Sequence, residues 1–559
     1  MPGSGAGSAP ITAMVPKARL FRAGLWGVAL TLQTGAGARI ENSLSAQLRG
    51  VVSTDQFSDD LRSWADMGVS GQLTANYNRL DASIAGSAGY RQAILGELAQ
   101  SEYVLGQANA SAQFVPGEVI LDLAATAQQG RETTGSLAGG VQNLDAENTL
   151  QIYSFYAQPR LSKNFGRSLS MYASYNAGYT FTTGRGGQAG LAGTNATGLR
   201  ESFTHGTQTS IGWQPGSSRL TLGLQSSWRE TRQERFDQRF ETARVGALAN
   251  LYVDRSLRGG VNVGYETVEN TQAAIILDPL TGFPVLDDDG DVVTDPGVRV
   301  TGFERRGAFG LANVSYTPSP RFAANMTAGY QDGGAYLSGR LGYRAGNYTS
   351  LSATVDRSLR TAGERGQRNR GFVLGDTTTV DLDGDGEAED LDEIGFECPG
   401  GFSEQGEQCV FAEALPILSG SFRQTRGSLS ARWQRNRSSL SASAFYEQRD
   451  YLDPEEIEGA DPVQVPALNR GATYSFGGNL AVSQRMLDDQ SISAAMRVAV
   501  TEDFDGEQIV RYTSNLNYRR GISEDLYLLA SLSASTGGRS STSGKNSLAA
   551  LGVGVGYRF

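Results

Sequence analysis

Apolar and polar residues alternate along most of the chain, most regularly in the final stretch, 547–559. One face of an extended strand there carries Ala549, Leu551, Val553, Val555, Tyr557 and Phe559. The opposite face carries alanine, glycine and Arg558. Such a strand leaves its backbone edges unpaired in lipid unless other strands close the sheet. The pattern therefore predicts a transmembrane β-barrel.

The alternation recurs in units of about ten to fifteen residues, separated by breaks that are short and long in turn. Strands are expected near 43–53, 65–77, 79–90, 107–116, 117–129, 150–163, 168–183, 200–214, 218–232, 241–256, 258–270, 302–317, 320–331, 335–345, 348–360, 421–436, 438–450, 469–486, 490–503, 507–520, 524–536 and 545–559. The predicted fold is an all-β, antiparallel, up-and-down barrel of about 22 strands, within a range of about 20 to 24. Short turns then face the periplasm, long loops face the exterior, and the last strand pairs with the first.

The face opposite the apolar one is rich in Ser, Thr, Asn, Gln, Arg and Gly, which predicts a lumen that is wet or filled by loops. Long external loops are expected at 184–199, 271–301, 361–420 and 451–468. The inward-facing arginines include Arg340, Arg344, Arg432, Arg511 and Arg519. They form either a ladder that selects anionic solutes or sugar acids, or ion pairs with carboxylates across the lumen. The sequence leaves both alternatives open.

Residues 1–38 have the features of a bacterial signal peptide. Basic residues at 17–22 precede an apolar run at 23–32, and small residues at 36–38 provide a cleavage site. The run is shorter than the roughly 20 residues of a membrane-spanning helix. Met14 is an alternative start, because the residues before it are mainly Gly, Ser, Ala and Pro. The barrel is expected to span 39–559, without the large N-terminal globular segment that plugs TonB-dependent transporters.

Charge and composition narrow the classes of function. The net charge of −11 argues against a nucleic-acid partner, which needs a basic face. His205 is the only histidine, and its position on a strand places it toward lipid near the outer rim. No clustered acid–base constellation is found, so the chain is not expected to be an enzyme.

An acidic motif lies in the long loop 361–420. Oxygen ligands occur at the spacing of a calcium-binding loop, with Gly386 at the sixth position: Asp381, Asp383, Asp385, Glu387, Glu389 and Asp392. The motif predicts a structural Ca²⁺ site. The alternative is a solvated acidic loop, because Asp replaces Glu at the last position and no helices are expected beside it.

The two cysteines, Cys398 and Cys409, follow the acidic motif in the same loop. In an exported protein this proximity favours a disulfide bond, and two free thiols are the alternative. A disulfide closing so short a loop stabilises by about 3 kcal/mol in the chain-entropy model. A metal pair is disfavoured, because no histidine lies nearby.

Three stretches resemble a known family: the strand, Asp-rich loop and strand of 43–90, the polar segment 156–166, and the segment from 333–338 to 352–358. Together they resemble the outer-membrane β-barrels associated with PEP-CTERM and exopolysaccharide systems, part of a broader group of β-barrel porins. The resemblance carries no catalytic residues. Tyr557 and the terminal Phe559 also resemble the C-terminal sorting signal of bacterial outer-membrane barrels, which implies the barrel assembly machinery as a partner.

The resemblance implies a Gram-negative outer-membrane protein that contacts lipid and lipopolysaccharide. The expected function is a conduit for, or a component of, exopolysaccharide or surface-protein export. The alternative is a general diffusion porin for small polar or anionic solutes.

Overall fold

The computed structural model describes the greater part of the chain from Arg39 to Arg558. The described residues are 39–55, 61–95, 101–131, 149–166, 168–183, 201–216, 219–234, 237–276, 285, 293–361, 421–451, 472–487, 489–502, 508–523, 525–539 and 546–558. Within these segments, no helix is long and apolar enough to cross a membrane.

The described residues form 22 strands in one sheet. The first eleven are β1 (Arg39–Asp55), β2 (Leu61–Tyr77), β3 (Leu80–Leu95), β4 (Ser101–Val115), β5 (Val119–Arg131), β6 (Thr149–Phe165), β7 (Leu169–Thr183), β8 (Glu201–Trp213), β9 (Leu220–Gln233), β10 (Gln238–Tyr252) and β11 (Leu257–Ile275). The others are β12 (Thr294–Ser319), β13 (Phe322–Gln331), β14 (Gly334–Arg344), β15 (Thr349–Thr361), β16 (Ser421–Arg435), β17 (Ser438–Tyr451), β18 (Ala472–Leu487), β19 (Gln490–Glu502), β20 (Gln508–Gly521), β21 (Leu526–Arg539) and β22 (Asn546–Arg558).

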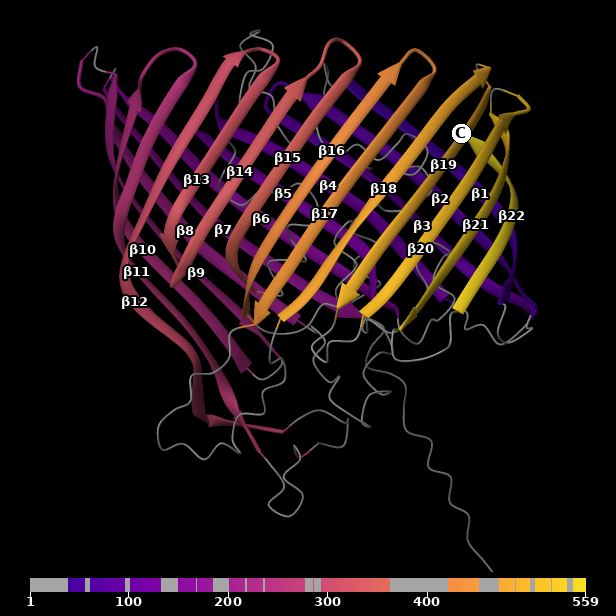
Figure 1. Ribbon diagram of the computed structural model, residues 1–559, viewed down its shortest axis with the longest axis horizontal. Coiled ribbons are helices and arrows are strands. Elements are labelled where there is room, and N and C mark those ends of the chain that lie inside the picture. The colour runs from indigo at the N-terminus through magenta and orange to yellow at the C-terminus, as the bar shows by residue number, and fades with distance from the viewer. Residues whose placement is uncertain are drawn as a thin grey trace, which may run out of the picture.

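Every strand pairs antiparallel with its neighbour along the chain, and β1 pairs with β22 to close the barrel (Figure 1). The closing register runs from Ser45 opposite Arg558 to Asp55 opposite Leu548. Closure leaves no unpaired sheet edge, which is the condition for a β-structure in lipid. The predicted antiparallel barrel, its strand count and its closing pair are thus confirmed.

The connections differ between the two ends of the barrel. Connections such as 78–79, 320–321 and 436–437 join strands at the end that we term the short-connection rim, at the top of Figure 1. The opposite end, the long-connection rim, holds the connections between β7 and β8, β15 and β16, and β17 and β18. In two short-rim turns, Gly117 and Gly346 adopt positive φ angles of 71° and 82°, which glycine tolerates without steric cost.

The outer face of the barrel is apolar and the inner face is polar, as the alternation predicts. On β22, Leu551, Val553 and Val555 are exposed on the outer face, whereas Ala550 on the inner face is buried. Exposed apolar side chains at every second position are expected where the surrounding solvent is lipid. Gly556 on the inner face lies beneath the ring of Tyr527, which stands directly opposite it on β21.

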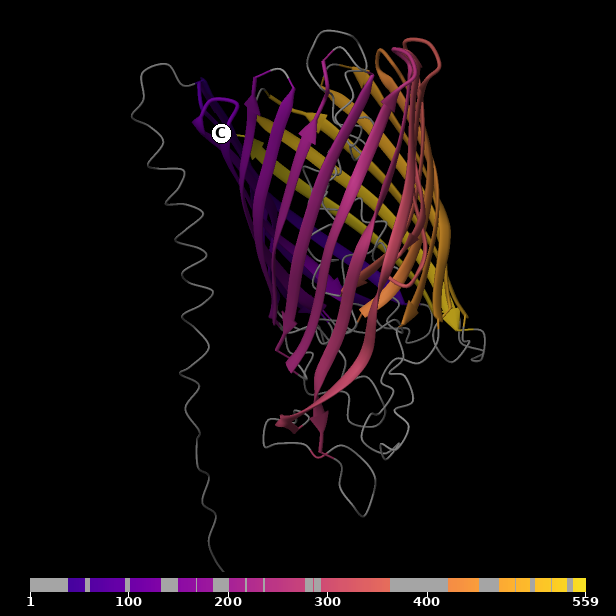
Figure 2. The ribbon, with the colours of Figure 1, turned by 90° about the vertical axis from the view of Figure 1, so that its left-hand side faces the viewer.

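β11 and β12 extend beyond the other strands at the long-connection rim (Figures 1 and 2). The prediction of a loop over 271–301 is therefore wrong at both ends, because 271–275 and 294–301 belong to strands. Residues 271–275 pair with 294–295 and 299–301. Two register shifts interrupt this ribbon, at Asn270/Thr271 and Ala273/Ala274. Polar residues interrupt the apolar alternation here. The pattern therefore predicts that the strands end, although the backbone pairing continues.

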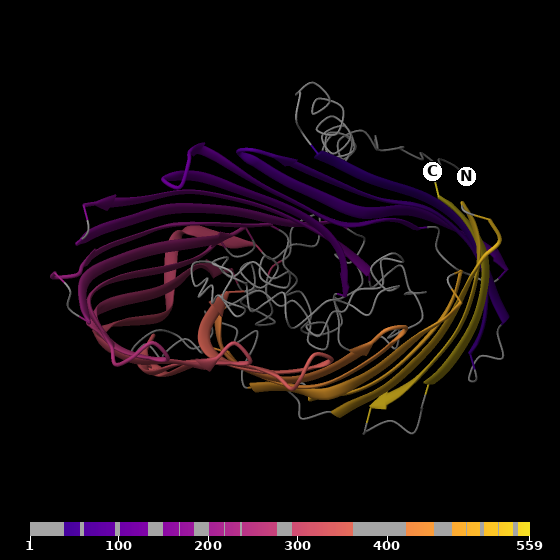
Figure 3. The same cartoon turned by 90° about the horizontal axis from the view of Figure 1, so that it is seen from above.

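The hairpin of β13 and β14 is shorter than its neighbours. β12 pairs with β13 only as far as Gly310 opposite Tyr330, and β14 pairs with β15 only as far as Leu337 opposite Arg357. Toward the long-connection rim, the parts of β12 and β15 beyond these pairs therefore flank the tip of a hairpin that ends within the wall. Seen from above, the wall encloses an elongated cross-section (Figure 3).

Candidate functional site in the barrel lumen

The inner wall carries pairs of hydroxyl groups that bridge neighbouring strands. Oγ of Ser154 lies 3.0 Å from Oγ1 of Thr180, and the Oγ1 atoms of Thr204 and Thr231 lie 3.0 Å apart. Further pairs are Ser352 with Ser430, Thr354 with Ser428, and Ser439 with Ser483. Hydroxyls opposite each other on paired strands hydrogen-bond readily and add to sheet stability. The result is a set of uncharged polar pairs on several parts of the inner wall.

The inner wall is open near one rim and covered near the other. On β7, Ser170 near the short-connection rim is exposed, whereas Thr180 toward the long-connection rim is fully buried. Thr204 and Thr231 at the same level are also buried, at 0% and 1% exposure. Inner-wall hydroxyls of a wide open channel would contact water. The inner wall of β7, β8 and β9 is therefore covered in its long-connection half.

A charged group, which we term the inner network, fixes the tip of the short hairpin. It consists of Arg244 on β10, Glu266 on β11, Asp332 between β13 and β14, and Arg423 on β16. The Asp332 N–H donates to Glu266 Oε1 at 2.6 Å, and Arg244 Nε donates to Glu266 Oε2 at 3.3 Å. Arg244 Nη2 also donates to the Asp332 carboxylate, and Arg423 Nη2 donates to the Asp332 carbonyl at 3.1 Å. Four separate parts of the chain thus meet at one turn.

The turn has two residues in the left-handed backbone region, and these contacts hold it in place. Asp332 adopts a φ of 55° and Gly333 a φ of 75°, and Asp332 is 4% exposed. Left-handed conformations are unfavourable for residues with a side chain. Arg305 lies against Gly333, because a Cβ atom added to this glycine would lie 2.7 Å from Arg305 Cδ.

Beside the inner network, an apolar group joins β15 to strands with which it is not paired. We call it the seam: Phe240 on β10, Val268 on β11, Phe303 on β12 and Leu359 on β15. Leu359 lies on the same face of the sheet as Leu429, whose side chain faces lipid. Leu359 is nevertheless buried, and it packs against the inward-facing Phe240 and Val268. The wall therefore folds over itself at the seam.

The five predicted inward arginines all have inner-face register. Arg340, Arg344 and Arg432 lie on β14 and β16, whereas Arg511 and Arg519 lie on β20. The guanidinium of Arg519 stacks over the ring of Tyr527, 4.1 Å from its centroid. The five thus occupy two separate parts of the wall rather than one ladder.

Other inner-wall arginines form ion pairs. Arg160 Nε lies 2.9 Å from Asp122 Oδ2, and Arg449 Nη2 lies 2.7 Å from Glu447 Oε1. Arg244 of the inner network contacts Glu266 and Asp332. These pairs involve arginines other than the five predicted ones, for which the choice between the two alternatives stays a prediction.

Several predicted site residues lie outside the described part of the chain. These are the acidic motif at Asp381, Asp383, Asp385, Glu387, Glu389 and Asp392, the pair Cys398 and Cys409, and Phe559. Among the described residues, no group of His, Cys, Asp and Glu side chains has the arrangement of a metal site. Tyr557 is exposed on the outer face of β22.

Sequence reasoning missed the inner network and the seam. Arg423 and Leu359 stand opposite each other on paired strands. The alternation of residues along these strands predicts that both side chains face lipid. Only the fold of the wall turns them toward Asp332 and Phe240. The one available signal was the adjacent Asp332 and Gly333, a pair that favours a tight hairpin turn.

The closed, apolar-surfaced, 22-stranded sheet defines this chain as a β-barrel of the outer-membrane type. No known protein family and no curated protein sequence matches the chain. Among solved structures, it is similar to the FrpB iron transporter from Neisseria meningitidis (F5-1 variant), with 8% identity, a TM-score of 0.44, and coverage of 93% of this chain and 83% of that chain. It is also similar to the ferric-catecholate import receptor Fiu from E. coli K12, with 9% identity, a TM-score of 0.45, and coverage of 93% and 82%.

Proposed function

We propose that the chain is a gated outer-membrane conduit, or a component of one, for a hydrophilic polymer such as an exopolysaccharide. The short-connection rim then faces the periplasm and the long-connection rim faces the exterior of a Gram-negative cell. The observation that carries the proposal is the inner wall of paired hydroxyls, open near one rim and buried near the other.

A hydroxyl-rich wall suits a sugar polymer because each hydroxyl can donate and accept hydrogen bonds. As a polysaccharide moves, its hydroxyls exchange partners with the wall and with water, so no single position retains it. The hydroxyl pairs themselves are uncharged, so they lack the strong fixed binding that arginine clusters would create. Conduction requires favourable entry without tight binding.

The burial of these hydroxyls supports a gated conduit rather than a general diffusion porin. A porin needs a continuous aqueous path through the barrel. Here the wall hydroxyls at the level of Thr204 and Thr231 have no access to solvent. The specific association with exopolysaccharide or surface-protein export rests on the resemblance in the sequence.

Two measurements test the proposal. We expect deletion of the gene to reduce secreted polysaccharide while uptake of small solutes stays unchanged. Normal polysaccharide with altered solute uptake would contradict it and support the porin. In planar bilayers, we expect the purified protein to show brief openings, because the proposed gate closes its resting lumen. A steady open conductance comparable to that of a porin would exclude the gated conduit.

A further inference from the structure

A group of charged side chains lies on the outer, lipid-facing side of β8, β9 and β10. We term it the outer cluster: His205, Glu230, Arg232, Arg239 and Glu241. Cross-strand register sets His205 opposite Glu230, Arg232 opposite Arg239, and Glu230 opposite Glu241. These residues have the same strand parity as Leu222, Leu224 and Val245, whose side chains are exposed on the outer face. The outer cluster therefore faces the membrane.

One carboxylate organises the outer cluster. Glu230 Oε1 lies 2.5 Å from Arg232 Nε and 2.8 Å from Arg239 Nε, and Glu230 Oε2 lies 3.4 Å from His205 Nε2. Arg239 Nη2 also contacts Glu241 Oε2 at 2.8 Å. The Glu230 side chain is 3% exposed, whereas those of Arg232 and Arg239 are 62% and 44% exposed. Two guanidinium groups thus lie over a buried anion and present their remaining N–H donors outward.

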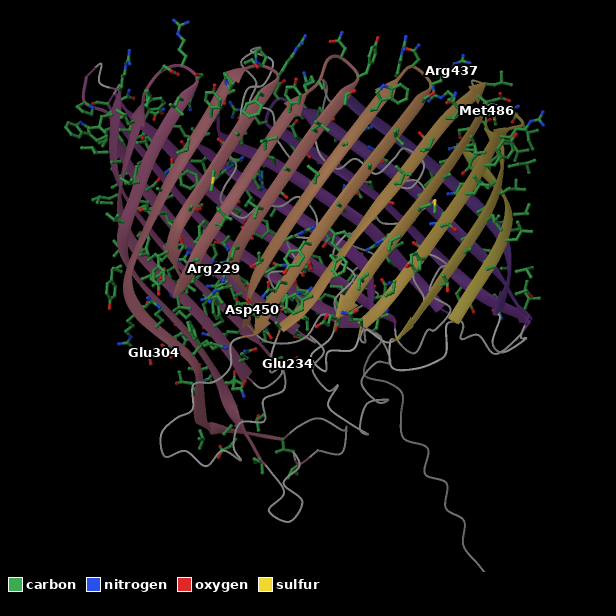
Figure 4. The ribbon with its side chains drawn as sticks, in the orientation of Figure 1. Arg229, Glu234, Glu304, Arg437, Asp450 and Met486 are labelled. Atoms are coloured by element: carbon green, nitrogen blue, oxygen red, sulfur yellow. The ribbon has the colours of Figure 1, made fainter. Side chains whose placement is uncertain are left out.

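The position along the strands places these donors near the membrane boundary. β9 ends at Gln233, directly after Arg232, and β10 begins at Gln238, directly before Arg239. Glu234, at the long-connection end in Figure 4, marks this level. Charged groups on the lipid face of a barrel are costly at the bilayer midplane and nearly free of cost at the interface. The outer cluster therefore lies where lipid headgroups lie.

Aromatic rings adjoin the outer cluster on the same face. The aromatic panel consists of Tyr153, Phe155, Tyr179, Phe181 and Phe203. The centroid of Phe181 lies 5.0 Å from that of Tyr153, 6.3 Å from that of Phe155 and 5.7 Å from that of Tyr179. The ring of Phe203 stacks on His205 at 5.1 Å. Tyrosine rings such as those of Tyr153 and Tyr179 are enriched at membrane interfaces.

We propose that the outer cluster and the aromatic panel bind one phosphorylated glycolipid of the outer leaflet, of the lipid A class. Its phosphate accepts hydrogen bonds from Arg232 and Arg239, which match phosphate geometry. Its sugar rings lie against the aromatic panel, and its acyl chains follow the apolar stripe of Leu222, Leu224 and Val245. The proposal depends on the direction of the barrel in the membrane and not on what the lumen transports.

The charges of the outer cluster define its selectivity. Glu230 and Glu241 offset the charges of Arg232 and Arg239, so long-range attraction to anions is weak. Binding then relies on directed hydrogen bonds together with ring and acyl contacts. We therefore expect inorganic phosphate alone not to bind, and phosphatidylglycerol, which lacks sugar rings, to bind more weakly than lipid A.

The test compares lipid A bound to the full-length purified barrel, measured by native mass spectrometry, in three proteins. In the double variant Arg232→Ala with Arg239→Ala, we expect affinity to fall at least about tenfold, the factor for losing one charge-assisted hydrogen bond. Arg306→Ala is the matched control, since Arg306 is also an outward arginine paired with a carboxylate, Glu304, labelled in Figure 4. We expect the control to bind as the wild type does.

Heat-modifiable migration in SDS gels confirms that each variant is folded before binding is compared. Wild-type binding by the double variant, or an equal loss in Arg306→Ala, would overturn the proposal.

A second variant, Phe181→Ala, tests the role of the rings. We expect it to weaken lipid A by about threefold and to leave phosphatidylglycerol unchanged, because ring contacts are modest in energy. Equal binding of both lipids by the wild type would overturn the assignment of the sugar rings.

Discussion

The inner network and the outer cluster lie on opposite faces of neighbouring strands and have similar composition. Each joins two arginines to two carboxylates. The inner network spans β10, β11, the β13–β14 turn and β16, whereas the outer cluster spans β8, β9 and β10. In the inner network, Glu266 and Asp332 are both buried and the side chain of Arg244 is 18% exposed. In the outer cluster, only the Glu230 carboxylate is buried beneath exposed guanidinium groups. The same residue types are therefore enclosed on one face and accessible on the other.

This difference separates a structural role from a binding role. In the inner network, the charged groups hydrogen-bond to one another and to the backbone of the Asp332 turn. Few of their N–H donors therefore face the lumen. Outside, the arginines are anchored by one acid and keep donors directed at the membrane. Burial, rather than composition, decides which charged group is available to a ligand.

The largest effect is expected from removing the cation of the inner network. Arg244→Met leaves Glu266 and Asp332 buried without the guanidinium between them, which destabilises by about 3 to 5 kcal/mol. Urea unfolding in lipid vesicles, followed by tryptophan fluorescence, measures the loss. Arg306→Met on the outer face is the control and is expected to change stability by less than about 1 kcal/mol. Equal losses in the two variants would remove the distinction between the faces.

The seam predicts the next largest effect. Leu359→Ala leaves a cavity beside Phe240 and Val268, and a loss of about 2 to 3 kcal/mol is expected. Leu551→Ala, at an exposed outer-face position, is the control because lipid fills the vacated space. The same unfolding measurement compares them. A larger loss of stability in Leu551→Ala would contradict the burial of Leu359 at the seam.

A smaller effect is expected from the acid of the outer cluster. Glu230→Gln releases Arg232 and Arg239 to headgroups and water, so a loss of only about 1 kcal/mol is expected. Glu304→Gln is the control, since its partner Arg306 is already exposed. Urea midpoints of both variants check this. A loss matching that of Arg244→Met would place the outer cluster among the enclosed, structural groups.

The smallest effect concerns Asp254, a carboxylate in the short-connection turn before β11 and outside both groups. The Oγ and N–H of Ser256 and the N–H of Leu257 donate to its carboxylate, which lowers its pKa below the ordinary value of 3.8. Its contribution to the turn is therefore complete above pH 3.8 and is lost as pH falls through the lowered pKa. An NMR titration of the Ser256 amide should show a midpoint below 3.8 that Asp254→Asn abolishes. A midpoint above 3.8 would contradict this pKa shift.

The alternation of residues was sufficient to predict the membrane-spanning strands, because lipid on one side and polar surroundings on the other impose a period of two. It was insufficient at β11 and β12, where pairing continues beyond the apolar band through polar residues such as Asn270 and Thr271. It also failed at Leu359 and Arg423, because parity predicts the face of a strand and not what covers that face.

The sequence by itself determined the barrel: its strands, its closure by the final stretch 547–559, and the apolar and polar faces. These properties follow from the contact of each strand with lipid. That contact depends only on the residues of the strand itself. Only the tertiary structure decided that the β13–β14 hairpin ends within the wall, that Asp332 meets Arg244 and Glu266, and that His205 belongs to a cluster with exposed arginines. These contacts join residues far apart in the chain, and their partners are set by strand register and by how the closed wall folds.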